Sequence, residues 1–311
     1  MGMLINGQWS TKWYEPDAKG HFVRSVTQFR DWITADGSSG FAAEPDRYHL
    51  YVSYACPWAH RTLIVRKLRG LESVIPISVV DPLMFDEGWA FSDNPGCVPD
   101  PISAAPFLRD VYTRAVADFT GRVTVPVLWD KRRGTIVNNE SLEIVRMFDT
   151  AFLEAGLGDP GVCFYPEALR AQIDQTVEAI YQPINNGVYR AGFATTQSAY
   201  DEAVHALFDA LERWDAVLAV QPFLCGDVVT EADWCLFTTL VRFDLVYHLH
   251  FKCNIKRIAD FPSLSRYLRD LYQIPGVAGT CNFDHIKEHY FRSHPSINPH
   301  RVVPAGPASF L

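Results

Sequence analysis

Cys56 is the residue whose type and position most directly suggest chemistry. It follows an alternating run over residues 48–53 that is typical of a strand, and Pro57 comes directly after it. Because proline lacks a backbone N–H, Pro57 suits the first position of a helix and makes Cys56 the N-cap. The sulfur would then face the free N–H groups of Trp58 and Ala59 and the positive end of the helix dipole, which favours the reactive thiolate.

The sequence around Cys56 excludes a local pair of cysteines. Position 59, three residues further on, is alanine, so the dithiol of a thioredoxin-type motif is absent. A buried structural cysteine is the commoner fate of this residue type, but the proline and the strand-to-helix turn favour a nucleophile. We therefore expect any disulfide of Cys56 to form with a thiol brought from outside the protein.

The overall composition favours a cytoplasmic globular protein with two domains. The chain has 311 residues, 48% of them hydrophobic and 21% charged, which is enough for two separate cores. A net charge of −8 and a pI near 5.7 argue against nucleic acid or an anionic membrane as the main partner. Residues 1–20 have no apolar core, so we expect no signal peptide, and no apolar run is long enough to cross a bilayer. The seven cysteines are widely spread without C-x-x-C spacing, which fits a reducing cytoplasm.

The elements that would position Cys56 follow the thioredoxin-like order. They are, in chain order, a strand over residues 48–53, a helix over 58–68, a parallel strand over 74–80, a strand over 124–128, an antiparallel strand over 135–137, and a helix with Leu142, Val145 and Phe148 on one face. Residues 81–121 form a long excursion between strands, with a helix near 108–117, and loops of this length usually have a function. A cis Val125–Pro126 bond would fit the bend before the third strand and leave the Val125 backbone exposed for pairing with a ligand.

After Gly156 the pattern becomes helical. An apolar stripe predicts a first helix over residues 169–184, which ends at Asn185-Asn186-Gly187, and a second helix is predicted over 204–218. A third helix begins at a capping box of Thr230 and Asp233 and runs to residue 249, and a fourth covers residues 264–271. We therefore expect an α/β plus all-α protein. Its parts are an N-terminal extension over 1–45, a thioredoxin-like domain over 46–155, and an all-helical domain over 156–311 with a tail from Cys281. The extension is interpreted as an extended arm packed by its aromatic residues.

Several motifs resemble a known family. The two halves together with Phe223–Trp234 resemble a glutathione transferase, and the finer motifs are similar to the xi class, the glutathionyl-hydroquinone reductases. These motifs are Cys56-Pro57-Trp58-Ala59, Gly88-Trp89-Ala90-Phe91, residues 121–130, Asn138-Asn139-Glu140-Ser141, residues 185–194 and residues 285–294. The resemblance covers nearly the whole chain, and six motifs in order are more specific than the transferase signature alone.

The resemblance implies a binding site for glutathione as co-substrate. The implied contacts are Glu140 and Ser141 with the γ-glutamyl end, the Val125 backbone with the cysteinyl backbone, Trp89 and Arg122 with glutathione, and Tyr189 and Tyr290 with the aromatic substrate. Each residue also has a simpler interpretation. Glu140 and Ser141 suit a helix start and Val125 an edge strand, while Trp89 could be packing and Arg122 a surface charge. The two tyrosines are among 13 in the chain.

Two further positions qualify the resemblance. His285 and His289 lie one helical turn apart and could bind a metal, but no glutamate stands in the second place of that motif and no clear third ligand follows. We therefore expect no metal. Phe291 stands where the family pattern has a second tyrosine, and the missing hydroxyl could change how a phenol is oriented.

The resemblance implies glutathione-dependent reduction of glutathionyl-hydroquinones through a Cys56–glutathione mixed disulfide. A thiol transferase or dehydroascorbate reductase similar to the omega class would use the same cysteine, and a non-catalytic binding protein with the transferase fold is a further alternative. Conjugation of glutathione to electrophiles is less favoured, because it normally needs a tyrosine or serine hydroxyl at position 56. A homodimer is expected, because transferase folds are usually dimeric.

Overall fold

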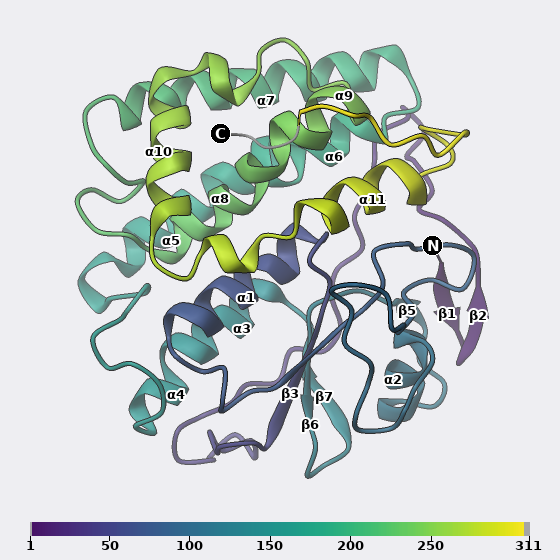
Figure 1. The fold of residues 1–311 in the computed structure, drawn as a ribbon, viewed down its shortest axis with the longest axis vertical. Coiled ribbons are helices and arrows are strands. Elements are labelled where there is room, and N and C mark those ends of the chain that lie inside the picture. The colour runs from purple at the N-terminus through teal and green to yellow at the C-terminus, as the bar shows by residue number, and fades with distance from the viewer. Residues whose placement is uncertain (1, 308–311) are drawn as a thin grey trace. The chain divides into compact units, whose positions relative to one another are not determined.

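The computed structural model describes residues 2–307, and these form two compact units that alternate along the chain (Figure 1). Unit 1 contains residues 2–13, 25–163 and 279–289, and unit 2 contains residues 14–24, 164–278 and 290–307. The N-terminal segment thus contributes to both units. The predicted domains over 1–45, 46–155 and 156–311 are contiguous, and their boundaries stay a prediction.

Unit 1 is built on a four-stranded sheet with the order β4-β3-β6-β7. Strand β3 (Tyr48–Val52) pairs in parallel with β4 (Ile77–Val79) and antiparallel with β6 (Val127–Asp130), which pairs antiparallel with β7 (Thr135–Asn138). The predicted strands are therefore confirmed, but the second and third begin later than expected. Pro76 and Pro126 each stand just before the observed start, because proline cannot donate to the ladder.

Two helices of unit 1 run side by side against this sheet (Figure 1). Helix α1 (Pro57–Leu68) has Cys56 as its N-cap and Pro57 at its start, as the sequence predicts. Helix α3 (Ser141–Asp149) buries Val145 and Phe148 as predicted, whereas Leu142 is only half-buried. The remaining helices of this part are α2 (Leu108–Ala115) and α4 (Ala151–Glu154).

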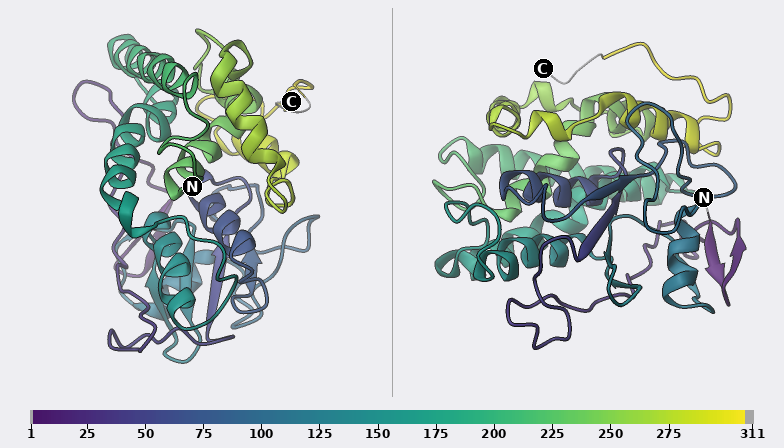
Figure 2. Two further views of the ribbon diagram at one scale, coloured as in Figure 1. Left: turned by 90° about the vertical axis from the view of Figure 1, so that its left-hand side faces the viewer. Right: turned by 60° about the horizontal axis from the view of Figure 1, so that its bottom comes forward.

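The N-terminal segment contains a second sheet that the sequence reasoning missed. A hairpin of β1 (Met3–Ile5) and β2 (Gln8–Ser10) is extended by β5 (Gly121–Arg122), and Figure 2 shows it in purple beside α2. The expectation of an extended arm is wrong for this part. Asn6 and Gly7 form the two-residue turn with φ values of 48° and 74°, and an Asn-Gly pair is the sequence signal for such a hairpin.

Unit 2 is helical. Its elements are α5 (Arg170–Ile180), α6 (Gly187–Gly192), α7 (Gln197–Leu218), α8 (Glu231–Arg242), α9 (His248–His250), α10 (Pro262–Gln273), two π-helical turns, η2 (Tyr181–Asn185) and η3 (Phe243–Tyr247), and the 3₁₀ turns η1 (Glu167–Leu169) and η4 (Ile258–Asp260). The capping box of Thr230 and Asp233 at the start of α8 is confirmed. Within residues 2–307, no helix combines the length and apolar character needed to cross a membrane.

One predicted helix end is wrong, and the predicted C-terminal tail contains a helix. The helix over 169–184 does not stop at Asn185-Asn186-Gly187 but continues through η2 into α6. Pro183 has no N–H to donate, and the wider turn accommodates it, with the Asn186 N–H donating to the Tyr181 carbonyl at 2.8 Å. The stretch from Cys281 is not only a tail, because after η5 (Ala278–Thr280) it forms α11 (Phe283–Ser293).

Candidate active site

Cys56 lies at the start of α1 and is partly exposed. Its Sγ–H donates to the Val125 carbonyl, with 3.7 Å between sulfur and oxygen. The sulfur makes no capping hydrogen bond to the helix N–H groups. Two features that the sequence predicted separately, the helix-start cysteine and the backbone before the proline, are therefore brought together. The Val125–Pro126 bond is cis, as expected.

The backbone beside Val125 is held by Tyr112, a residue that the sequence reasoning missed. The buried Tyr112 hydroxyl donates to the Thr124 carbonyl at 2.8 Å and accepts from the Thr124 N–H at 3.2 Å. Asn139 donates its side-chain amide to the same hydroxyl at 3.1 Å. The strand edge facing Cys56 is thus fixed by a tyrosine of α2, and only the fold brings that tyrosine there.

Glu140 and Ser141 form the start of α3. The Glu140 carboxylate accepts the Leu142 N–H at 3.4 Å, so Glu140 is the N-cap. The buried Ser141 hydroxyl accepts from the Arg61 guanidinium at 3.4 Å, and the guanidinium lies 4.5 Å from the centre of the Trp58 ring. Backbone N–H groups, a hydroxyl and a buried cation gathered at a helix N-terminus suit a carboxylate ligand.

Trp89 is nearly buried, with 6% of its surface exposed. The His289 ring stacks on it at 5.0 Å between centroids, and His289 Nδ1 donates to the Pro82 carbonyl at 2.8 Å. His285 similarly bonds the Pro95 carbonyl at 2.8 Å. The two histidines of α11 therefore hold the long excursion. In the described part of the chain, no three His, Cys, Asp or Glu side chains gather as metal ligands would.

Arg122 lies in β5, and its guanidinium donates to the backbone carbonyl of Lys12. This contact ties β5 to the segment that follows β2. Arg122 is partly exposed.

Unit 2 brings together the two predicted tyrosines. The Tyr189 and Tyr290 hydroxyls lie 2.6 Å apart, and the Tyr290 hydroxyl also lies 2.9 Å from that of Tyr247. Burial raises the pKa of Tyr247 and of Tyr290 well above the usual value, so both stay protonated at neutral pH. Tyr247 was missed, because in sequence it belongs to an ordinary apolar helix.

Phe291 is buried next to this cluster. Its ring packs edge-on against His250 at 5.0 Å between centroids, and its carbonyl accepts from the Asn298 amide at 2.7 Å. The position that has a tyrosine in the family pattern is here part of an aromatic packing.

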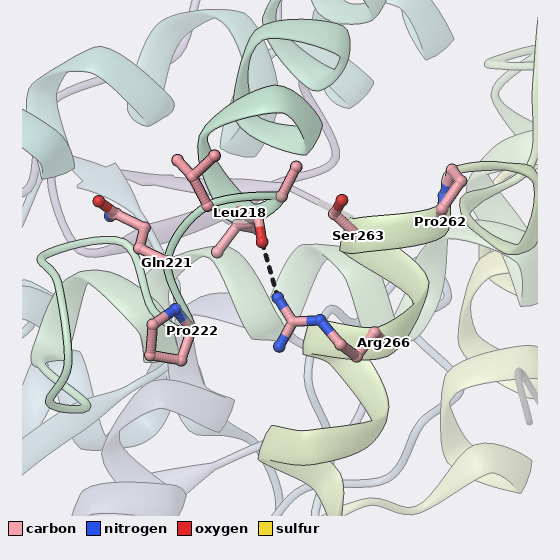
Figure 3. Close-up of a pocket in the computed structure, with 8 residues that line it drawn as sticks. Leu218, Gln221, Pro222, Pro262, Ser263 and Arg266 are labelled. Atoms are coloured by element: carbon pink, nitrogen blue, oxygen red, sulfur yellow. Dashed lines mark hydrogen bonds between the residues drawn. The ribbon is translucent and has the colours of Figure 1, made fainter.

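An open depression of about 420 Å³ lies on unit 2 at the end of α7 and the start of α10 (Figure 3). Arg266 crosses it and donates to the Leu218 carbonyl at 2.8 Å. None of the predicted site residues lines this depression. Its lining contains one hydroxyl, that of Ser263, but no histidine or carboxylate that could activate it.

Comparison with known proteins supports the fold. A family model described as glutathione S-transferase, N-terminal domain, matches residues 55–151, and one described as the C-terminal domain matches residues 197–270. The predicted fold class, a thioredoxin-like domain followed by an all-helical glutathione-transferase domain, is confirmed.

Individual relatives match along nearly the whole chain. Glutathionyl-hydroquinone reductase YqjG of Escherichia coli (strain K12) is 54% identical over 99% of this chain and 95% of its own length. The structure of a xi class transferase from Natrialba magadii has a TM-score of 0.93 at 54% identity and covers 100% of this chain and 94% of that one. The glutathione-bound structure of YqjG has a TM-score of 0.90 at 52% identity, and the match covers 98% of this chain and 96% of that one. The chain belongs to the glutathione transferase family and, within it, to the xi class, the glutathionyl-hydroquinone reductases.

Proposed function

We propose that this protein reduces glutathionyl-hydroquinones to hydroquinones, with glutathione as co-substrate and Cys56 as the nucleophile. The observation that carries the proposal is the position of the partly exposed residue Cys56 at the N-terminus of α1, with its sulfur 3.7 Å from the Val125 carbonyl oxygen. The names of the relatives and the glutathione bound to one of them support the same substrate class.

The reaction consists of two displacements at sulfur. The Cys56 thiolate attacks the thioether sulfur of the substrate, so a Cys56–glutathione disulfide forms as the bond between sulfur and ring carbon breaks. The ring carbon takes the electron pair and a proton, which gives the hydroquinone. A second glutathione thiolate then attacks the sulfur of the bound glutathione, releasing oxidised glutathione and restoring Cys56. The net reaction consumes one glutathionyl-hydroquinone and one glutathione.

We assign the glutathione site to the start of α3 and the neighbouring strand edge. Glu140 and Ser141 would hold the γ-glutamyl end of glutathione, with the backbone N–H groups of that helix holding its carboxylate, and the Val125 backbone would pair with the cysteinyl residue. Trp89 and Arg122 complete the proposed site. The carbonyl of Val125 already contacts the sulfur that the bound glutathione would approach.

The protonation of the ring carbon is assigned to the tyrosines of unit 2. Because a carbon leaving group is poor, it must gain a proton as its sulfur departs. We propose that Tyr189 and Tyr290 bind the ring hydroxyls and support this transfer. Tyr290 bridges the hydroxyls of Tyr189 and Tyr247, so a negative charge that develops on Tyr189 could be stabilised by a hydrogen bond.

The test is a steady-state assay of Cys56→Ser with glutathionyl-hydroquinone and glutathione. We expect turnover to fall at least a thousandfold, because a serine hydroxyl neither ionises at neutral pH nor forms a disulfide. Cys163→Ser, which changes an exposed cysteine, is the control and should keep full activity. Full activity of Cys56→Ser would rule out the scheme. A simple mixed disulfide as parallel substrate separates this function from an omega-like thiol transferase, which would prefer the disulfide.

We further propose that the protein is a cytoplasmic homodimer that needs no metal. The seven widely spread cysteines support a reducing compartment.

A further inference from the structure

The segment over residues 14–24 belongs to unit 2, although the chain on both sides of it belongs to unit 1. It is fixed to the turn between α6 and α7. The Thr195 N–H donates to the Gly20 carbonyl at 3.0 Å, and the Thr196 hydroxyl donates to the Lys19 carbonyl at 2.7 Å. Gly20 has a φ of +89°, and a Cβ there would lie 2.7 Å from the Thr196 side chain. Only glycine fits, so the path of this segment is closely specified.

This segment places Arg24 over the ring of Tyr189. The guanidinium carbon lies 4.8 Å from the centre of the Tyr189 ring, and Arg24 Nε donates to the Asn186 side chain at 3.0 Å. Asn186 in turn accepts the Tyr189 backbone N–H at 3.0 Å. Arg24 thus contacts both the ring and the helical turn that carries it. The Phe22 ring lies 5.4 Å from the same guanidinium and supports it.

Aromatic rings also surround Tyr189. Phe193 stacks on its ring at 6.3 Å, and the rings of Phe251 and Tyr247 lie at 5.4 and 6.0 Å. Its hydroxyl bonds that of Tyr290. Arg24 places a positive charge over this ring. A cation over an aromatic face is attracted by the ring quadrupole, and the attraction grows as the phenol oxygen gains negative charge.

We propose that Arg24 is a positioning residue for Tyr189, and that the N-terminal segment is therefore part of the machinery that handles the aromatic substrate. This inference rests on the proposed function, since Tyr189 is assigned there to the hydroquinone ring. The guanidinium holds the phenol ring in the orientation in which its hydroxyl meets both Tyr290 and the substrate. It also stabilises the charge that Tyr189 acquires when it donates to the ring carbon.

The experiment compares Arg24→Met, which keeps the length of the side chain but removes its charge, with Arg24→Lys, which keeps a cation. On glutathionyl-hydroquinone we expect kcat/KM to fall about tenfold in Arg24→Met and to stay within about threefold in Arg24→Lys. Reduction of a simple glutathione mixed disulfide, which needs no proton on carbon, should change by less than about twofold in both. Arg213→Met on the exposed face of α7 is the control for general loss of charge.

The proposal is overturned if Arg24→Met keeps the parent kcat/KM, or if Arg24→Lys is impaired as strongly as Arg24→Met. A loss of equal size on the mixed disulfide would also overturn it, because the effect would then not be confined to the aromatic substrate.

Amide hydrogen exchange over residues 187–193 gives a readout that does not depend on turnover. Faster exchange in Arg24→Met supports the positioning role and unchanged exchange contradicts it. If the parent protein fails to reduce glutathionyl-hydroquinone, the proposed function is wrong, and the hydrogen-exchange result alone tests the positioning role of Arg24.

Discussion

At the scale of single residues, the side chains of the proposed site are held by hydrogen bonds to neighbouring groups. Cys56 contacts the Val125 carbonyl, and Ser141 accepts a hydrogen bond from a buried arginine. Because the Arg61 guanidinium can only donate, the Ser141 hydroxyl keeps its own proton to donate, and it gives that proton to the Glu140 carboxylate over a long distance of 3.5 Å. In the proposed site, a carboxylate of glutathione is a second acceptor to which this hydroxyl can turn.

Ser141→Ala should therefore weaken glutathione binding with little effect on the chemical step. A hydrogen bond to a charged group contributes about 1.5–3 kcal/mol, which corresponds to roughly a tenfold to hundredfold rise in the KM for glutathione. Ser263→Ala, which also changes a serine in the first turn of a helix, is the matched control. Steady-state kinetics with glutathione as the varied substrate measure the effect. An unchanged KM would show that Ser141 only begins the helix.

At the scale of elements, the α8 capping box is held by four hydrogen bonds to one buried carboxylate. The Asp233 carboxylate accepts the N–H groups of Leu224 and Thr230 at 2.9 and 2.7 Å, and the hydroxyls of Thr230 and Tyr267 at 3.0 and 2.9 Å. Burial raises the pKa of Asp233, and these four donors oppose that shift. One side chain thus joins the start of α8 to a loop and to α10.

Asp233→Ala should lower the free energy of unfolding by about 3–5 kcal/mol, because it leaves several buried donors without an acceptor. Urea denaturation followed by circular dichroism measures the change. Asp260→Ala removes the equivalent carboxylate from the exposed capping box of η4 and should have a much smaller effect. Equal effects in the two variants would show that burial does not set the strength of this cap.

Strand β3 contains a buried histidine that links stability to pH. Burial lowers the pKa of His49 from 6.5 to about 4, and His49 Nε2 bonds the Ser78 hydroxyl at 2.8 Å. Between about pH 4 and pH 6.5 the unfolded chain binds the proton more readily than the folded one. The contribution of neutral His49 to the free energy of unfolding is therefore complete above pH 6.5 and is lost as the pH falls towards 4.

Between pH 6.5 and pH 4 the free energy of unfolding should fall by about 3 kcal/mol, because each unit of pKa shift corresponds to roughly 1.4 kcal/mol. His49→Gln should remove that share of the pH dependence, so the difference in unfolding free energy between parent and variant should change between pH 7 and pH 4. Denaturation curves at both pH values give the comparison. A difference that is the same at both would contradict a neutral buried His49.

Sequence reasoning succeeded for elements with strong local signals and failed where partners come from distant parts of the chain. Pro57 and the apolar period placed α1 and its N-cap correctly, and the Thr230/Asp233 pair located the start of α8. The Asn6-Gly7 hairpin had a local signal that was overlooked. Tyr112 and Tyr247 could not have been found, because the hydroxyls of both act through residues that only the fold brings near.

At the scale of the whole molecule, the chemistry is assigned to one sulfur and a set of tyrosines, with no metal. The histidines of α11 that suggested a metal pair bond backbone carbonyls of the excursion instead. Dialysis of the protein against EDTA should therefore leave the turnover of glutathionyl-hydroquinone unchanged. Metal analysis of the dialysed protein is the control. A loss of activity that added Zn²⁺ or Mg²⁺ restores would contradict the account.

The most direct measurement is the intact mass of the protein after the first displacement, before a second glutathione can restore Cys56. The protein, freed of glutathione, is mixed with less than one equivalent of glutathionyl-hydroquinone, quenched with acid and analysed by mass spectrometry with peptide mapping. The account predicts one glutathione bound to Cys56 and an equal amount of free hydroquinone. Release of hydroquinone from a protein whose Cys56 stays unmodified would contradict it.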